Sequence, residues 1–176
     1  MSSKQEIRNA MKALEVAFQS DKAASECEAY WSGIEARDAF RNAGTVLLYM
    51  AIRGEIPTAG FIERWAGKKR IALPLVKGDT LELREYRPSK ICKGYKGISE
   101  PTPEAPLISP EEIDFAIIPG VAFAPADDGG FKRLGRGKGF YDRLLPLLHC
   151  PTVPAGYSFR FIEHLPADPW DVDITG

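Results

Sequence analysis

The sequence predicts an α/β fold in which helices cover both faces of an open, mostly parallel sheet. Two runs, residues 45–51 and 113–118, are almost continuously apolar, which is typical of strands buried on both faces of a parallel sheet. Segments with the apolar spacing of helices precede and follow these runs. Strands and helices that alternate along one chain produce an open sheet between helical layers.

Two helices are expected before the first strand. Ser3 begins the first helix, because Glu6 follows three residues later and completes a capping-box pattern. Asp21 is expected to cap the second helix, which should span residues 22–42. The first helix should bury one apolar stripe, made of Ile7, Met11, Leu14 and Phe18.

The other elements follow from apolar runs and from the positions of glycine and proline. The first strand should lead into a loop at 53–58 and a short helix that ends near residue 66. Further strands are expected at 71–76, 80–86 and 152–157. The alternation over 80–86 is typical of a half-exposed edge strand. Residues 87–112 are rich in proline and are predicted to form one long loop, which in a compact domain is often functional.

Length and composition indicate a single soluble domain. The chain has 176 residues, of which 44% are hydrophobic and 27% charged, and its formal net charge is −1. This balance excludes a general attraction to nucleic acid or to a membrane surface. The sequence has no signal peptide and no apolar run that could span a membrane, so we expect a cytoplasmic protein. Three widely spaced cysteines and two histidines favour neither disulfides nor a zinc site.

Residues 133–142, with the sequence RLGRGKGFYD, carry the strongest functional signal. A buried strand at 113–118 precedes this loop, and a helix over 140–148 is expected to follow it. The three alternating glycines let the backbone approach a ligand, and consecutive N–H groups can surround an anion. Arg133, Arg136 and Lys138 add charge that suits phosphate. The spacing is neither that of a P-loop nor that of a dinucleotide fingerprint, and the alternative is a solvated basic loop.

Asp142 is expected in the first turn of the helix that follows the glycine loop, beside any phosphate bound there. Magnesium in proteins usually shares one or two carboxylate ligands with phosphate oxygens and water. Asp142 is therefore a candidate magnesium ligand. The alternative is an acid that only interacts favourably with the helix dipole.

The segments PGVAF (119–123) and RLGRGKGFYDRLL (133–145) closely resemble the signature of the 5-formyltetrahydrofolate cyclo-ligase (5,10-methenyltetrahydrofolate synthetase) family. The resemblance implies a single domain over residues 1–176 with a three-layer α/β/α sandwich. It implies an enzyme that uses ATP and Mg²⁺ to convert 5-formyltetrahydrofolate to 5,10-methenyltetrahydrofolate, ADP and phosphate through a phosphorylated imidate. The implied partners are these small molecules, without nucleic acid or membrane, and we expect a monomer.

The same resemblance implies roles for individual residues. ATP contacts would come from Lys4, Arg8, Arg133, Leu134, Gly135, Arg136, Gly137, Lys138, Gly139, Phe140 and Tyr141. Folate contacts would come from Met50, Glu55, Arg136, Gly137, Lys138, Gly139 and Phe140. Arg136 and Lys138 would be catalytic. Asp142 and Asp171 would hold Mg²⁺, and Asp173 competes with Asp171 for that role.

Three of these residues have a simpler interpretation from the sequence pattern alone. Lys4 and Arg8 are neighbours at i and i+4 on a helix and could be two solvated cations. Glu55 could be an exposed loop acid. It also follows the carboxyl end of the first strand, however, where α/β sheets bind their ligands.

The sequence departs from the family pattern in two places. Gly97–Pro101 resembles a family segment that an aromatic residue often precedes, but Lys96 stands there, with Tyr95 one position earlier. A family glutamine is also absent near 159–161. These departures support an alternative function, a non-catalytic protein that binds nucleotide or folate as a sensor. A kinase-like phosphotransferase acting on another small molecule is a second alternative.

Overall fold

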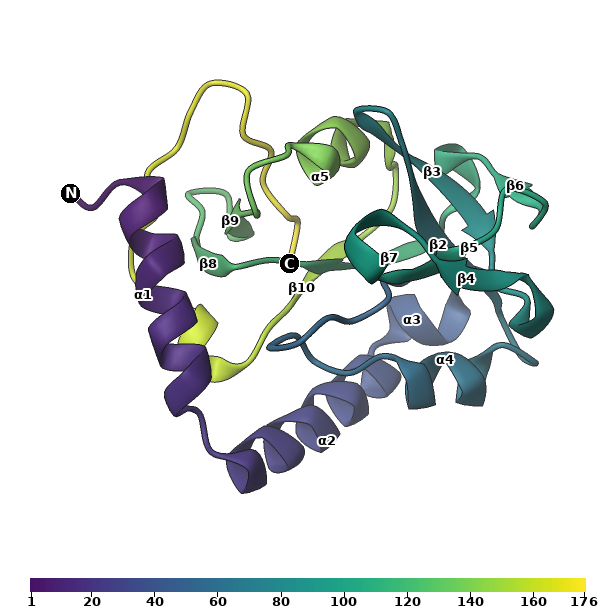
Figure 1. The fold of residues 1–176 in the computed structure, drawn as a ribbon, viewed down its shortest axis with the longest axis horizontal. Coiled ribbons are helices and arrows are strands. Elements are labelled where there is room, and N and C mark those ends of the chain that lie inside the picture. Colours follow the sequence, from purple (N-terminus) through teal and green to yellow (C-terminus); the bar gives the residue numbers. More distant parts are fainter.

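The computed structural model describes residues 1–176, apart from the side chain of residue 95. A six-stranded sheet with the order β10-β7-β1-β2-β3-β6 forms its centre (Figure 1). Four neighbouring strands are parallel, namely β10 (Thr152–Ala155), β7 (Phe115–Pro119), β1 (Thr45–Leu47) and β2 (Arg70–Lys77). The antiparallel strands β3 (Thr80–Glu85) and β6 (Leu107–Ile108) extend the sheet. The sheet is open and mostly parallel, as predicted.

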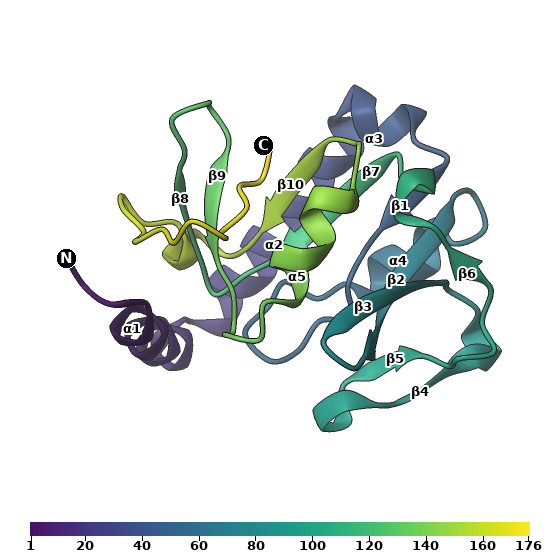
Figure 2. The same ribbon diagram turned by 90° about the horizontal axis from the view of Figure 1, so that it is seen from above.

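Helices cover both faces of the sheet (Figures 1 and 2). One face carries α2 (Ser20–Ala36), α3 (Asp38–Asn42) and α4 (Ala59–Trp65), and the other carries α5 (Phe140–Leu144). Successive strand residues point to opposite faces: Val46 belongs to the buried cluster of Trp31 and Phe61, whereas Leu47 belongs to that of Leu144. The predicted three-layer α/β/α sandwich is confirmed.

The first helix, α1 (Lys4–Ala17), stands beside the sheet (Figure 1). It packs on a hairpin formed by β8 (Ala122–Pro125) and β9 (Phe131–Leu134). The predicted capping box is present, because Glu6 N donates to Ser3 Oγ at 3.2 Å and Ser3 N donates to Glu6 Oε2 at 2.6 Å. The cap fixes where α1 begins, and hence where its first-turn side chains lie.

The apolar stripe of α1 is only partly as predicted. Ile7 and Met11 are buried, but Leu14 is 46% exposed. The half-buried Glu15 faces the protein instead, because its carboxylate pairs with the buried Arg160 at 3.0 Å. A polar residue on the inner face of a helix gives no apolar signal in the sequence.

The helix predicted over 22–42 is two helices in the structure. Asp21 lies in the first turn of α2 and does not cap it. The backbone is extended at Arg37 (φ −73°, ψ 131°), which separates α2 from α3. In a continuous helix Trp31 and Phe40 would be about two and a half turns apart and would face opposite sides. The break lets both side chains enter the core.

The strand predicted over 45–51 is shorter than expected, since β1 ends at Leu47. After that residue the chain is tied to the loop that follows. The hydroxyl of Tyr49 donates to the carbonyl of Ile56 at 2.8 Å. The backbone carbonyl of Tyr49 accepts from Thr58 Oγ1 at 2.7 Å. These bonds replace the pairing that a longer strand would make.

Residues 87–112 do not form one irregular loop. They contain the antiparallel hairpin of β4 (Ile91–Lys93) and β5 (Ser99–Pro101). They also contain β6, which pairs with β3, so β3 is not the edge strand that its alternation predicted. The β8–β9 hairpin was likewise not predicted. Strands of two to four residues are too short for a period-2 pattern to be recognised.

The helix predicted over 140–148 ends earlier. α5 stops at Leu144, and a 3₁₀ turn follows over Leu145–Leu147. Pro146 explains the change, because proline has no N–H to donate and its ring obstructs a continuing α-helix.

The structure also shows the state of the cysteines and the character of the helices. The three cysteines are free thiols, and no described helix has the length and apolar character needed to cross a bilayer.

Candidate active site

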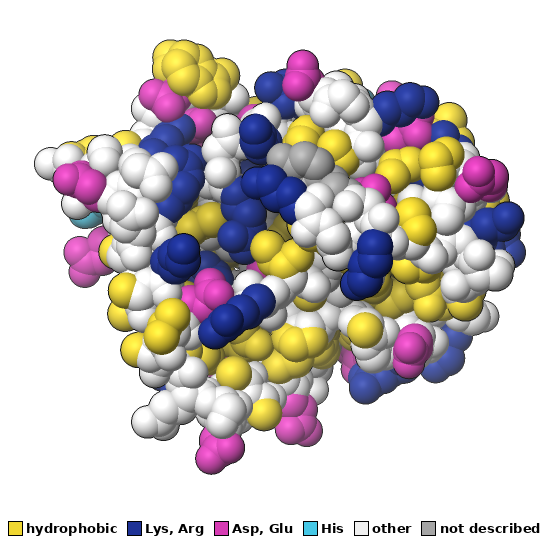
Figure 3. All heavy atoms as spheres, viewed as in Figure 1, with side chains coloured by type: hydrophobic (Ala, Val, Ile, Leu, Met, Phe, Trp, Pro, Cys, Tyr) yellow, Lys and Arg dark blue, Asp and Glu magenta, His cyan; other side chains and the backbone are white. Residues whose placement is uncertain are grey.

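A cavity of about 940 Å³ opens at the carboxyl ends of β1 and β7. From these two neighbouring strands the sheet continues to β2 on one side and to β10 on the other. Open α/β sheets bind ligands at such a switch point. Residues at and just after the ends of the two strands line the cavity, namely Tyr49, Met50, Pro119 and Gly120. Figure 3 shows Lys and Arg side chains gathered around the hollow.

Several other parts of the chain complete the walls of the cavity. Residues 133–143 form one wall, and residues 96 and 98–100 of the β4–β5 hairpin form another. The first helix contributes Lys4 and Arg8, and the C-terminal segment contributes Asp168, Trp170 and Asp171. Pro74, Val76, Leu81 and Ile98 supply apolar surface. The cavity therefore has a cationic side and an apolar side.

The glycine loop requires its glycines for two different reasons. Gly137 (φ 103°) and Gly139 (φ 71°) have left-handed backbone conformations, which residues with a Cβ rarely adopt. Gly135 has no such conformation, but a Cβ there would come within 2.9 Å of the guanidinium of Arg133. The loop thus takes its path because glycine stands at each alternate position, as the sequence predicted.

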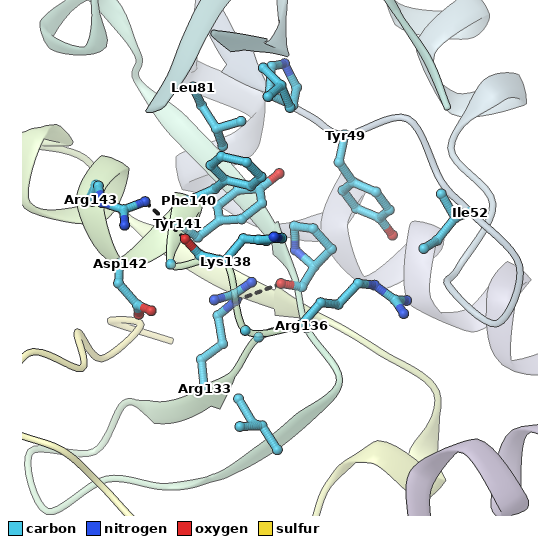
Figure 4. Close-up of a pocket in the computed structure, with 18 of the residues that line it drawn as sticks. Tyr49, Ile52, Leu81, Arg133, Arg136, Lys138, Phe140, Tyr141, Asp142 and Arg143 are labelled. Carbon is cyan, nitrogen blue, oxygen red and sulfur yellow. Dashed lines mark hydrogen bonds between the residues drawn. The ribbon is translucent and has the colours of Figure 1, made fainter. Parts of the chain in front are cut away.

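Arginine side chains hold the glycine loop at both ends. At the start, Arg8 Nε donates to the carbonyl of Gly135 at 2.9 Å. At the end, Arg143 Nη1 donates to the carbonyl of Lys138 at 3.0 Å and to that of Asp79, in the β2–β3 turn, at 2.6 Å (Figure 4). Helix α1 and strands β2 and β3 therefore fix the loop over the cavity.

Arg133 is half-buried below the loop. Its Nε donates to the carbonyl of Pro119 at 2.7 Å, and its guanidinium lies 4.8 Å from the centre of the Tyr141 ring. Burial lowers the pKa of Arg133 and raises that of Tyr141. No carboxylate of the described residues forms an ion pair with Arg133. A half-buried cation that forms no ion pair with a carboxylate favours the binding of an anionic ligand beside it.

Arg136 connects the loop to Glu55. Its Nη2 lies 3.2 Å from Glu55 Oε1, and Glu55 Oε2 accepts from the backbone N–H of Ile52 at 3.1 Å. The Glu55 side chain is only 9% exposed, whereas that of Arg136 is 51% exposed. Figure 4 shows Arg136 and Lys138 extending from the loop toward Tyr49 and Ile52. Glu55 is therefore a partly buried acid of the cavity and not an exposed loop residue.

Lys4 joins the first helix to the C-terminal segment. Its Nζ lies 2.6 Å from Asp168 Oδ2 and 2.6 Å from Asp171 Oδ2. Burial alone lowers the pKa of Lys4, but the hydrogen bonds and charges of the two acids outweigh it, and the net shift is upward. The two ends of the chain thus meet at one side of the cavity.

The acids of the cavity could hold a magnesium ion only if phosphate oxygens and water supplied its other ligands. Asp142 lies in the first turn of α5, as predicted, and lines the cavity with Asp168 and Asp171. Asp173 is exposed and does not line it. Among the described residues no three acidic, cysteine or histidine side chains gather to form a metal site. The donor set suits Mg²⁺ held by one or two carboxylates, with phosphate oxygens and water as the other ligands.

Every residue that the sequence nominated lines this one cavity, except Asp173, the alternative to Asp171. The lining includes both members of the Lys4–Arg8 pair, Met50, Glu55, Asp142, Asp171 and the loop 133–141. Their individual roles in binding and catalysis stay predictions. Lys96 also lines the cavity, with a left-handed backbone (φ 51°). Tyr95, the aromatic residue one position before Lys96, lies outside the described side chains.

Several cavity residues were not nominated from the sequence. Arg143 lies within the segment 133–145 that resembles the family signature, and Asp168 lies three residues before Asp171, but neither was assigned a role. The apolar residues Ile52, Pro74, Val76 and Leu81 lie in loops and strands that gave only structural signals. Their position at the cavity depends on how β2 and β3 are placed in the sheet.

The fold and the cavity together define an α/β protein with a ligand site at the switch point of its sheet, lined by a cationic glycine loop. Comparison with known proteins specifies the family. The family model described as "5-formyltetrahydrofolate cyclo-ligase family" matches residues 1–176. The chain therefore belongs to the 5-formyltetrahydrofolate cyclo-ligase family of enzymes.

Individual relatives agree with this assignment. The chain is 35% identical to the 5-formyltetrahydrofolate cyclo-ligase of Escherichia coli K12 over 75% of each chain. It is 34% identical to that of Haemophilus influenzae, over 76% of this chain and 74% of the relative. The solved structure of 5,10-methenyltetrahydrofolate synthetase from Aquifex aeolicus superimposes with a TM-score of 0.86 at 32% identity, covering 97% of this chain and 86% of that one.

Proposed function

We propose that this protein catalyses the ATP- and Mg²⁺-dependent conversion of 5-formyltetrahydrofolate to 5,10-methenyltetrahydrofolate, with release of ADP and phosphate. The observation that carries the proposal is that one loop contacts both predicted substrate sites. Arg8, on the predicted nucleotide side, bonds the Gly135 carbonyl, and Glu55, on the predicted folate side, pairs with Arg136. The relatives described above are named 5-formyltetrahydrofolate cyclo-ligase and 5,10-methenyltetrahydrofolate synthetase, which supports the conversion itself.

The reaction has two chemical steps. The formyl oxygen attacks the γ-phosphorus of ATP, the bond to the β-phosphate oxygen breaks, and ADP leaves. The product is an imidate phosphate in which the formyl carbon is electrophilic. N10 of the folate then attacks that carbon, phosphate leaves with the former formyl oxygen, and N10 loses its proton. Neither step needs a nucleophile from the protein, so catalysis consists of positioning and charge stabilisation.

The loop cations supply the charge stabilisation. Arg133 would lie beneath the phosphates as a half-buried positive charge, and Arg136 and Lys138 would approach the transferred phosphoryl group from the loop. The backbone N–H groups around Gly137 and Gly139 would donate to phosphate oxygens. Asp142 and Asp171 would hold Mg²⁺, which when bound neutralises phosphate charge.

The folate would occupy the side of the cavity near the carboxyl end of β1. A pterin ring presents an amine and a ring N–H side by side, and an ionised carboxylate accepts from both. Glu55 supplies such a carboxylate, and the apolar surface of Ile52, Val76 and Leu81 is suited to the flat faces of a ring. The volume of about 940 Å³ lies at the upper end of the range for ligand pockets.

The decisive test is a spectrophotometric assay for 5,10-methenyltetrahydrofolate. We expect product only when 5-formyltetrahydrofolate, ATP and Mg²⁺ are all present, and one ADP for each product molecule. Release of ADP without methenyl product would indicate a phosphotransferase instead. Binding of both ligands by folded protein without turnover would indicate a sensor. Product formed equally well without ATP would overturn the proposed mechanism.

A further inference from the structure

The side chain of Arg160 is the largest polar group buried in the molecule, and the proposed chemistry gives it no role. It ends the 3₁₀ turn Ser158–Arg160 and is only 2% exposed. Its Nη1 donates to the carbonyl of Val121 at 2.9 Å, and its Nη2 lies 3.0 Å from Glu15 Oε2. Its Nε and Nη2 both donate to the carbonyl of Gly54, at 3.1 Å and 2.5 Å. Burying a guanidinium is costly unless such partners surround it.

Each partner of Arg160 belongs to a segment that shapes the cavity. Gly54 immediately precedes Glu55, and Val121 immediately follows Gly120 of the cavity lining. Glu15 lies on α1, which carries the cavity residues Lys4 and Arg8. One side chain thus joins three segments beneath the site.

The contact with Gly54 has the most direct effect on the site. Gly54 has a left-handed backbone (φ 82°), and a Cβ there would overlap the carboxylate of Glu15 that Arg160 holds. Glu55 N donates to the carbonyl of Ile52 at 3.1 Å, and Glu55 Oε2 accepts from Ile52 N. Hydrogen bonds between Ile52 and Glu55 therefore close the tight turn 52–55. Arg160 holds the same turn through the carbonyl of Gly54.

We propose that Arg160 is the positioning residue for Glu55. By fixing the peptide unit between Gly54 and Glu55, its two bonds determine where the Glu55 carboxylate points. Glu15 supports this arrangement, because it orients the guanidinium of Arg160 and fills the space that a side chain at position 54 would need. This inference rests on the proposed function only in that Glu55 is taken to contact the folate.

The test uses Arg160→Lys, which keeps the positive charge but cannot reach all the acceptors at once. Arg84→Lys is the matched control, because Arg84 also donates to a backbone carbonyl, that of Ala105 at 2.9 Å, and pairs with Glu82. Neither Arg84 nor Glu82 lines the cavity. The same substitution at Arg84 therefore reports the effect on stability alone.

We expect Arg160→Lys to raise the KM for 5-formyltetrahydrofolate about tenfold, with a change of less than about twofold in the KM for ATP. In the Glu55→Gln background the same substitution should raise the folate KM by less than about twofold, because residues that act through one group are not additive. If Arg160→Lys changes the KM for folate and the KM for ATP equally, Arg160 only supports the fold. The same conclusion follows if its effect on the folate KM multiplies that of Glu55→Gln in the double variant.

Amide hydrogen exchange tests the inference independently of activity. The N–H groups of Ile52 and Glu55 should exchange at least about tenfold faster in Arg160→Lys and unchanged in Arg84→Lys. Unchanged exchange in both variants overturns the inference even if the enzyme is active, whereas an inactive wild-type protein overturns the proposed function alone. If Arg160→Lys does not fold, Glu15→Gln replaces it, and the same exchange pattern is expected at reduced size.

Discussion

At the scale of single residues, the proposed function gives two acids of the cavity, Asp142 and Glu55, different roles. Asp142 lines the cavity from the first turn of α5. Glu55 is largely buried and already bonded to Arg136 and to the Ile52 N–H. The proposed function uses the charge of Asp142 for a metal and the acceptor geometry of Glu55 for a pterin. Substitutions that remove charge and keep shape therefore separate the two roles.

Asp142→Asn should abolish methenyltetrahydrofolate formation while the melting temperature changes little. A first-turn helix acid contributes only about 0.3–1 kcal/mol to stability, whereas the loss of a metal ligand removes phosphate neutralisation. The control is Asp173→Asn, an exposed acid outside the cavity, which should retain activity. A folded and fully active Asp142→Asn enzyme would show that this acid is structural.

Glu55→Gln should raise the KM for 5-formyltetrahydrofolate at least about tenfold, because a hydrogen bond to a charged group contributes about 1.5–3 kcal/mol. ATP affinity measured by calorimetry without folate should change little. A loss of ATP affinity with intact folate affinity would place Glu55 in the nucleotide site, and the proposed arrangement of the two substrates would then be wrong.

At the scale of secondary-structure elements, segments outside the central sheet supply much of the cavity wall. Helix α1 packs on the β8–β9 hairpin and reaches the C-terminal segment through Lys4. The glycine loop is held by α1 at one end and by the β2–β3 turn at the other. The site therefore depends on contacts between elements as much as on the loop itself.

The ion pairs of Lys4 should make the docking of α1 sensitive to alkaline pH. The pKa of Lys4 in the folded protein lies above its ordinary value of 10.5, so its stabilising contribution is fully present below that value. The contribution is lost as the pH rises through the raised pKa. The difference in melting temperature between wild type and Lys4→Met should be constant from about pH 7 to 10 and should shrink at higher pH.

The control for this pH dependence is Lys12→Met, which replaces an exposed lysine of the same helix. Its melting temperature should follow that of the wild type at every pH. A Lys4→Met difference that grows above pH 10 would contradict the linkage, because it would mean that the charged lysine destabilises the fold.

At the scale of the whole molecule, the cavity brings together residues from both ends of the chain. A nucleotide bound there would contact α1, the glycine loop and the neighbourhood of the C-terminal segment at once. Ligands that bind only the folded state stabilise it by mass action. The melting temperature therefore reports ligand binding at the site without requiring turnover.

ATP with Mg²⁺ at about one hundred times its Kd should raise the melting temperature by about 5–10 °C. ATP without Mg²⁺ should give a smaller rise, and inorganic phosphate at the same concentration should give less still. Equal shifts for phosphate and for ATP with Mg²⁺ would indicate a general anion site and would contradict a nucleotide site.

The sequence by itself determined the sheet core and the glycine loop, since both are specified by local patterns. Continuous apolar runs identify strands covered on both faces, and alternating glycines identify a loop that comes close to a ligand. The family signature in the same loop led to the nominated residues, all of which except Asp173 line one cavity. The capping box at Ser3 was confirmed because its two partners lie three residues apart.

Only the tertiary structure decided which distant residues meet. Lys4 pairs with acids 164 and 167 positions away, and Arg136 pairs with Glu55 at a separation of 81. The contacts of Arg160, the break at Arg37 and the short hairpins also leave no periodic trace in the sequence. Their common physical reason is that a polar contact across the fold depends on where the sheet topology places each segment, and a local pattern of residues carries no information on that placement.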